Sequence, residues 1–369
     1  MSPFSPLVCC FIICLLLISA ASAGWPDLNG DWSVNFADFA RLANAWYETA
    51  NDSNWDPLCD IAPVHSDGII DEQDLKVICD NWLAALPTDL VAPGATLQVV
   101  YNVSGEFYEG ATWDFASSKL YFTKMTPETS RILRLDAPGT AYIWMNSVPL
   151  TNGMFLSIDG KLLTADQNIR QIRSHDIGPS GPLNTTVVCT APYSEKPNDL
   201  CQLSNGNIYF TCPNWSSPTN QGTYLLKSGV ITRVNNGLNQ PNGIIASLDE
   251  TKLYLAESST DDTSKMRWWV FPINPDGTLG TGSIFFQPTD LTGMRYADPD
   301  GMTIDERGNL YLTGMGGVWI VSPAGVELAR IPIAEQANNM SFGGPDYKTL
   351  YIACKDKVYS LDMAVHGGE

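Results

Sequence analysis

Hydrophobic and polar positions repeat along most of the chain. From residue 97 onward, six short apolar or aromatic segments each follow a polar turn: 119–123 (KLYFT), 161–165 (KLLTA), 207–211 (NIYFT), 252–256 (KLYLA), 309–313 (NLYLT) and 349–353 (TLYIA). Another apolar segment precedes each turn, which predicts a β-hairpin in every unit. The intervals of 42, 46, 45, 57 and 40 residues leave room for about four strands per unit.

This period predicts an all-β, six-bladed β-propeller over residues 97–369. One small sheet cannot bury both of its faces, so the units must stack in a ring. Segment 96–103 (TLQVVYNV) is expected to join the last blade, because closure removes an exposed sheet edge. The extra length of the fourth unit, around 258–281, is interpreted as a surface insertion. A β-sandwich is the alternative, but it does not explain a repeated strand at this interval.

Residues 24–87 form a separate acidic module. The segment 27–38 (DLNGDWSVNFAD) places oxygen-bearing side chains at the spacing of a calcium loop, and an amphipathic helix is expected after it. These side chains are Asp27, Asn29, Asp31, Asn35 and Asp38. Trp32 stands where such loops prefer glycine. A looser second copy within 59–83 offers Asp67, Asp71 and Asp74.

The two loop–helix units resemble a type I dockerin domain. The resemblance implies calcium in both loops and a cohesin-type protein partner. A calcium-stabilised fold without a cohesin partner is the alternative. Residues 88–96 are predicted to be a linker to the propeller.

The N-terminus predicts export. Residues 7–19 are apolar and uncharged, and Ala21-Ser22-Ala23 provides small residues for cleavage, so 1–23 is interpreted as a signal peptide of a secreted, periplasmic or cell-surface protein. No other apolar run approaches spanning length, so no membrane contact is expected after cleavage. A retained anchor is the alternative, because no lysine or arginine precedes the run. Among the remaining cysteines, Cys59 and Cys79 are the favoured disulfide pair, and the others are expected to be thiols.

The charge and the histidines exclude several classes of function. A net charge of −19 argues against nucleic acid as a partner and suits cation binding. The three histidines are His65, His175 and His366; His175 is expected in a loop, and none lies at the start of an inner strand, so a Ser-His-Asp triad is disfavoured. The chain has no GxSxG motif and no His/Cys cluster typical of zinc sites.

Oxygen-bearing side chains recur just before or at the start of each predicted inner strand. By the symmetry of the ring they should meet at one mouth of the central channel, where a hard divalent cation would find ligands. They are Glu109, Asn152, Asn198, Asn242, Asp300 and Asn338 or Asn339. Turn capping by Asn and Asp is the alternative, but it does not require the two carboxylates.

The segments around these residues resemble the gluconolactonase/regucalcin (senescence marker protein) family. The resemblance extends over about residues 97–365 and rests on EGATWD (109–114), KPNDL (196–200), QPNGI (240–244), DPDGM (298–302) and NNMSFGGPD (338–346). It implies a six-bladed propeller that hydrolyses sugar lactones with a channel-bound divalent metal (Ca, Zn, Mn or Mg). It also implies Glu109, Asn242 and Asp300 as metal ligands and Asn198 as a substrate contact. The family usually has arginine where Lys196 stands and histidine near Gln167, which leaves the identity of the lactone open.

The chemistry of lactone opening fits these residues. A carboxylate beside the metal can accept the proton of the attacking water, and Asp300 is assigned as ligand and general base together. Glu109 is assigned as a ligand, and Lys196 and Asn198 as contacts to the sugar oxygens or the oxyanion. The alternative is a non-catalytic propeller that binds carbohydrate or protein with structural calcium.

Overall fold

The structure is a computed structural model. It describes Leu28, Val34 and residues 36–49, 51–56, 59–60, 68–80, 90–126, 130–192, 195–216, 219–235, 237–258, 266–288, 291 and 297–368. These residues divide into two compact units, a small one before residue 89 and a large one after it. The predicted signal peptide lies outside the described residues, as do Asp27, Asn29, Asp31, Asn35 and Asp67. No helix in the described ranges combines the length and apolar character that crossing a bilayer requires.

The small unit contains two short helices, each after one of the predicted loops. Helix α2 spans Phe36–Asn44 and helix α3 spans Glu72–Asp80. They share a hydrophobic core that includes Leu42 and Ile78. The segments beside the helices are also joined, because the Tyr47 backbone N–H donates to the Ile70 carbonyl at 2.8 Å. The two predicted helices are therefore present, whereas calcium binding and the likeness to a dockerin stay predictions.

Three carboxylates of the predicted calcium loops have structural partners here. Buried Asp38 accepts a hydrogen bond from the Leu28 N–H at 2.7 Å, and buried Asp74 accepts one from the Asp71 N–H at 2.8 Å. Asp71 in turn accepts from the Gln73 N–H at 2.8 Å. Acidic side chains that accept backbone N–H groups stabilise a helix start without a metal.

The cysteine pairing expected from spacing is wrong. Cys59 is a thiol in the core of the small unit, so no Cys59–Cys79 disulfide forms. Burial raises the pKa of the Cys59 thiol to about 12, which keeps the group protonated and unreactive.

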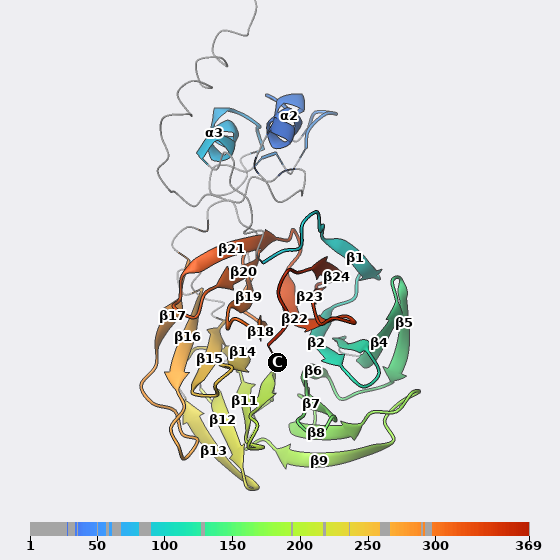
Figure 1. Cartoon of the computed structure of the whole chain (residues 1–369), viewed down its shortest axis with the longest axis vertical. Helices are drawn as coiled ribbons and strands as arrows, with labels where there is room; N and C mark the ends of the chain where they lie inside the picture. Colours follow the sequence, from blue (N-terminus) through green and yellow to red (C-terminus); the bar gives the residue numbers. More distant parts are fainter. Residues whose placement is uncertain are drawn as a thin grey trace, which may run out of the picture. The chain divides into compact units, whose positions relative to one another are not determined.

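The large unit is a six-bladed propeller, as predicted, with four antiparallel strands in each sheet (Figure 1). The first three blades comprise β2 (Tyr108–Asp114), β3 (Lys119–Lys124), β4 (Arg131–Ala137) and β5 (Thr140–Met145); β6 (Thr151–Leu156), β7 (Leu162–Asp166), β8 (Gln171–Asp176) and β9 (Asn184–Thr190); and β10 (Leu200–Gln202), β11 (Ile208–Cys212), β12 (Gly222–Lys227) and β13 (Val230–Asn235). The last three comprise β14 (Pro241–Ala246), β15 (Lys252–Glu257), β16 (Arg267–Pro272) and β17 (Ser283–Phe286); β18 (Met302–Ile304), β19 (Leu310–Gly314), β20 (Gly317–Val321) and β21 (Glu327–Pro332); and β22 (Ala337–Gly343), β23 (Thr349–Cys354), β24 (Lys357–Asp362) and β1 (Gln98–Asn102).

The ring closes through the strand expected to close it. β1 pairs antiparallel with β24, with Gln98 opposite Ser360, so the sixth sheet combines the two ends of the propeller sequence. Residues ahead of β1, within the predicted linker, also attach to this blade. The Ala92 N–H donates to the Asp362 carbonyl at 3.1 Å, and Leu90 and Val91 are buried.

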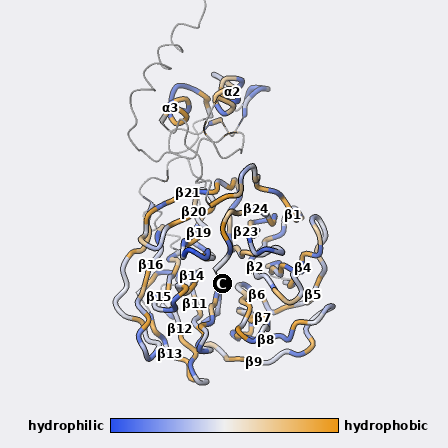
Figure 2. The backbone as a smooth tube through the Cα atoms, in the orientation of Figure 1, coloured by the Kyte–Doolittle hydropathy of each residue, from blue (hydrophilic) through white to orange (hydrophobic). Residues whose placement is uncertain are grey.

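The hydrophobic core lies mainly between neighbouring blades. One buried cluster combines Leu163 and Ile172 of the second blade with Phe210 and Tyr224 of the third. Hydrophobic residues occur along the strands of every blade (Figure 2). Because each sheet covers the face of the next, the apolar residues of the repeated segments become buried only in the assembled ring.

Part of the region interpreted as an insertion in the fourth unit belongs to the blade itself. The region 258–281, interpreted as a surface insertion, contains β16, the third strand of that blade. Its Trp268 is completely buried and packs on Phe286. The prediction of a surface insertion over the whole of 258–281 is therefore wrong, because β16 belongs to the blade.

His175 lies in strand β8 and not in a loop as expected. The ring is fully buried, with Nε2 at 3.1 Å from the Thr164 hydroxyl and Nδ1 at 2.9 Å from the Thr185 hydroxyl. Burial, with a smaller contribution from Arg173, lowers its pKa to about 4. His175 lies in the third strand of its blade and not at the start of an inner strand, so a Ser-His-Asp triad at the channel remains disfavoured.

We predict that His175 makes the fold acid-sensitive. Between pH 6.5 and 4 the unfolded chain binds a proton at this residue and the folded chain does not, so the free energy of unfolding falls as the pH falls. The loss reaches about 3 kcal/mol at pH 4. Urea unfolding of wild type and His175→Gln across this range measures it, since glutamine can still hydrogen-bond to both threonines. Parallel pH profiles for the two chains would contradict the prediction.

Candidate active site

The first strands of the six sheets surround the centre of the ring, and the predicted site residues lie at their starts (Figure 1). All of these side chains are at most 8 % exposed. Glu109, Asn152, Asn242, Asn338 and Asn339 belong to inner strands, and Asn198 and Asp300 lie just before β10 and β18. The prediction that one side chain from each blade reaches the same level of the channel is therefore supported by the order of the strands.

Hydrogen bonds join each blade to the next at this level. In each case a backbone carbonyl at or beside a site residue accepts a bond from the neighbouring blade. The bonds are Thr123 Oγ1 to the Asn152 carbonyl (3.2 Å), Gly153 N–H to the Asn198 carbonyl (2.8 Å), Thr211 Oγ1 to the Asn242 carbonyl (2.7 Å), Ser258 Oγ to the Pro299 carbonyl, Gly301 N–H to the Asn338 carbonyl (2.7 Å) and Asn338 Nδ2 to the Tyr108 carbonyl (2.9 Å). The threonine of the KLYFT-like strands donates two of these bonds, and the equivalent Thr313 Oγ1 also donates to the Asn338 carbonyl at 3.3 Å.

The ladder between the first and second strands is irregular at this level. In the first blade the register shifts between Glu109 and Thr112, and in the fourth between Pro241 and Ile244. The second and sixth blades have shifts at the equivalent place. Such an irregularity frees a side chain from the alternation of the strand and turns it toward a site.

Glycines allow the inner strands to approach one another. A Cβ on Gly153 would lie 2.3 Å from Asp199 Oδ1, and one on Gly301 would lie 2.6 Å from Asn339 Cγ. Larger residues cannot be accommodated there without displacing the neighbouring blade. The third blade has Asp199 where the first, second, fourth and fifth have glycine. That departure is the signal by which Asp199 could have been selected from the sequence, and our sequence analysis did not use it.

Asp199 completes a cluster of three buried carboxyl groups with Glu109 and Asp300. Burial raises the pKa of all three, to about 7 for Asp199. The charges of Glu109 and Asp199 raise the pKa of Asp300 further. Burial, together with the charge of Asp199, likewise raises the pKa of Glu109 to about 8. The cluster therefore favours a positive charge, either protons or a cation.

Other acidic residues near the ends of the inner hairpins are paired with arginine. Asp166 pairs with Arg173, Glu195 with Arg233 at 2.7 Å, and Glu257 with Arg267 at 2.6 Å. Within the described ranges, no such ion pair reaches Glu109, Asp199 or Asp300. In the described part of the chain, arginine thus neutralises these outer acids, whereas the inner three have no ion-pair partner there.

Two amide oxygens beside the cluster also lack a hydrogen-bond donor. Asn242 donates from Nδ2 to the Ser258 hydroxyl at 3.2 Å, and its Oδ1 is buried with no partner. Asn338 donates to the Tyr108 carbonyl, and its Oδ1 is likewise orphaned. Buried oxygens without donors are rare and costly, and hard cations bind such oxygens together with carboxylates.

The predicted ligand set therefore fits a divalent cation by its chemistry. Glu109, Asn242 and Asp300 supply two carboxylates and one orphaned amide oxygen. In the part of the chain that the structure describes, no group of three or more His, Cys, Asp and Glu side chains is arranged to hold a metal by itself. A metal site that combines these carboxylates with the Asn242 oxygen stays a prediction.

The two predicted substrate contacts differ in exposure. Asn198 is buried, and its backbone bonds to Thr211 and Gly153 fix its place in the ring. The Lys196 side chain is exposed, two residues before it. A role for Lys196 in substrate binding stays a prediction.

Comparison with known proteins gives a consistent result. The family model SMP-30/Gluconolactonase/LRE-like region matches residues 107–355. The chain is 32 % identical over 247 residues to a gluconolactonase of Zymomonas mobilis, covering 59 % of this chain and 65 % of that protein. It is 24 % identical over 262 residues to the pentonolactonase XacC of Haloferax volcanii, covering 70 % and 84 %. The match thus extends over slightly less than two thirds of the Zymomonas protein.

Solved structures share the fold. A putative gluconolactonase superimposes with a TM-score of 0.67 at 21 % identity, over 77 % of this chain and 98 % of that one. A gluconolactonase of Xanthomonas campestris superimposes with a TM-score of 0.64 at 22 % identity, over 75 % and 92 %. Since the family model covers well over half of the sequence, the chain belongs to the SMP-30/gluconolactonase/LRE-like family.

Proposed function

We propose that this protein hydrolyses sugar lactones in the propeller channel with a divalent cation held by Glu109, Asn242 and Asp300. The observation that carries the proposal is the cluster of buried carboxyls that no described lysine or arginine neutralises, beside two amide oxygens without donors. Relatives named gluconolactonase and pentonolactonase support the class of substrate. Ca, Zn, Mn and Mg are the candidate cations.

Lactone opening adds water to the carbonyl carbon of a cyclic ester and breaks the bond to the ring oxygen. A divalent cation supplies a Lewis acid and lowers the pKa of bound water. Asp300 accepts the proton from the attacking water and returns it to the ring oxygen as that oxygen leaves. Glu109 serves mainly to hold the cation, and Asn198, with Lys196, contacts the oxygens of the sugar.

Asp199 adds an acceptor that the sequence analysis did not assign. Its carboxyl is buried beside Glu109 and Asp300, and its Oδ1 already accepts the Leu200 N–H at 2.9 Å. The remaining oxygen can accept a hydrogen bond from a hydroxyl group of the sugar. We assign Asp199 to substrate binding on this basis.

A non-catalytic propeller that binds carbohydrate or protein is the second candidate. It does not require the uncompensated carboxyls, so the first candidate is favoured. Export by residues 1–23 and calcium-dependent docking of residues 24–87 to a cohesin-type partner complete the proposal. They rest on the sequence patterns described above.

Asp300→Asn is predicted to abolish most of the lactonase activity. Asparagine keeps the shape but cannot accept a proton, so kcat should fall by about 10²–10⁴-fold. The assay follows opening of glucono- and pentonolactones by pH indicator, with EDTA and then with added Ca, Zn, Mn or Mg. Asp298→Asn is the matched control, since Asp298 is acidic and close in sequence but only half-buried. Its charge raises the pKa of Asp300 less than the charges of Glu109 and Asp199 do, so this variant should lose far less activity than Asp300→Asn. Full activity in Asp300→Asn, or wild-type activity that EDTA does not reduce, would contradict the proposal.

Asp199→Asn should act mainly on substrate binding. Loss of one charge-assisted hydrogen bond to a sugar hydroxyl corresponds to a rise in KM of about tenfold, with a smaller effect on kcat. A deoxy-lactone that lacks the contacted hydroxyl should show the same KM for both proteins. If KM for the hydroxylated lactone is unchanged, Asp199 does not contact the substrate.

A further inference from the structure

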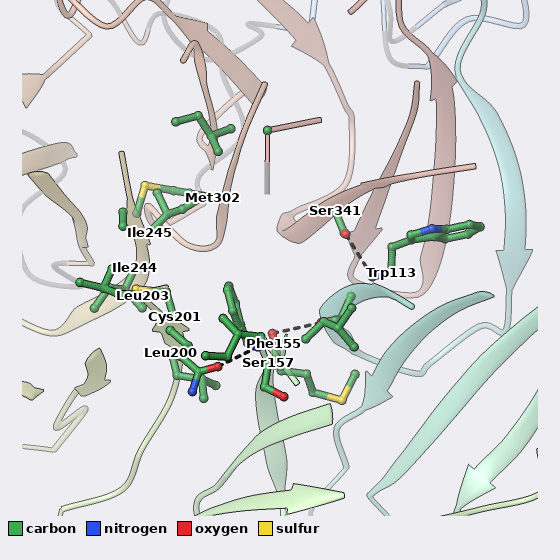
Figure 3. A pocket seen from close by; sticks show the side chains of 18 of the residues that line it. Trp113, Phe155, Ser157, Leu200, Cys201, Leu203, Ile244, Ile245, Met302 and Ser341 are labelled. Atoms are coloured by element: carbon green, nitrogen blue, oxygen red, sulfur yellow. Dashed lines mark hydrogen bonds between the residues drawn. The ribbon is translucent and has the colours of Figure 1, made fainter. Parts of the chain in front are cut away.

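The central channel continues past the carboxyl cluster into a chamber of about 510 Å³. All six blades contribute to its wall, and Figure 3 shows side chains from different blades around the common space. Asp199 and Asn339 line one end, whereas Glu109, Asn242 and Asp300 do not line it. The chamber therefore meets the proposed lactone site at Asp199 and extends away from the predicted metal ligands.

Apolar side chains form most of the chamber wall. Leu200, Ile244, Ile245 and Met302 project from three inner strands, with Phe155 from a fourth (Figure 3). A volume of this size is typical of cavities that bind small organic molecules, which lie between about 300 and 1,000 Å³. The chamber spans the inner strands from Asp199 to Ser204, roughly 17 Å of extended chain.

The far mouth of the chamber is also apolar, although it is built from turns. Phe115, Ile158 and Leu248 come from turns after the inner strands of three blades and are 51 %, 61 % and 46 % exposed. Tyr347 lies beside Phe115, with ring centroids 4.8 Å apart. Turns normally carry polar residues, so a group of exposed apolar side chains around one opening indicates a binding function.

Charge restricts the class of ligand. The charged side chains of the described chamber wall are Asp199 at the inner end and Glu250 near the mouth, and no lysine or arginine lines it. An anion would be repelled at both ends, and a charge of either sign would lose its hydration along the apolar wall. Asp199 can still accept a hydrogen bond from a neutral polar group, and the Asn339 amide can accept or donate one.

We propose that this chamber binds an uncharged, elongated and mainly apolar molecule, with a hydroxyl or similar donor directed toward Asp199 and Asn339. This second binding site is entered from the apolar mouth and meets the lactone site at Asp199, and its apolar part does not depend on lactone hydrolysis. A protein side chain inserted from a partner is the other occupant that the mouth would fit. The volume, the length and the closed ring around the chamber favour the small molecule.

The test uses the purified chain and the neutral fluorophore 1-aminoanthracene. Fluorescence should rise to saturation, 1-octanol should displace the probe, and octanoate of the same chain length should displace it much less. Ile245→Trp fills the chamber and should weaken probe binding about tenfold or more. Val230→Trp, on an exposed position of β13, is the matched control and should bind like wild type.

A second variant covers the case in which Ile245→Trp does not fold. Leu248→Glu adds a charge at the exposed mouth, where folding tolerates it, and should also weaken binding. Thermal unfolding followed by circular dichroism establishes that each variant is folded. A folded wild type without saturable binding would overturn the proposal and leave the mouth as a protein contact. Equal displacement by octanol and octanoate, or unchanged binding in Leu248→Glu, would overturn it too.

Discussion

The hydrogen bonds between neighbouring blades at the starts of the inner strands hold the site in place. Carbonyls at or beside the channel residues accept bonds from the next blade, through threonine or serine hydroxyls, glycine N–H groups and the Asn338 amide. These bonds fix the six sheets at the same height along the channel. They also hold the side chains at that height close together, although these side chains do not all bond to one another directly. The apolar faces between blades stabilise the ring, but these polar bonds set the relative height of the strands.

The closeness of the buried channel carboxyls lowers the free energy of unfolding of the protein. Three carboxyls are buried together, and no lysine or arginine of the described ranges forms an ion pair with them. Uncompensated buried charge destabilises a fold by several kcal/mol unless a proton or a cation is bound. Clusters of this kind typically mark functional sites, and the arginine partners of Asp166, Glu195 and Glu257 show that the protein neutralises acids elsewhere. A functional role explains why Glu109, Asp199 and Asp300 have no described arginine partner, whereas these other acids do.

The sequence predicted the propeller because its repeat is local: each blade carries its own hairpin, polar turn and apolar strand. The channel residues followed from symmetry, since equivalent positions of a ring must meet. Features that depend on one blade alone were missed. Asp199 stands in the third blade where four other blades have glycine, and no repeat marked it. The region 258–281 was interpreted as a surface insertion, although it contains β16. The Cys59–Cys79 disulfide was inferred from spacing, which does not determine whether two thiols bond. The chamber depends on side chains from all six blades and has no signature in any one repeat.

We expect the channel to bind a divalent cation through Glu109, Asn242 and Asp300. Crystals soaked in Mn²⁺ and measured at a wavelength where manganese scatters anomalously test it without an assumption about the substrate. If these three side chains hold the cation, one strong anomalous peak should appear in the channel within coordination distance of all three. The peak should disappear in Asp300→Asn. A channel without a peak at saturating Mn²⁺, or a peak that persists unchanged in the variant, would contradict it.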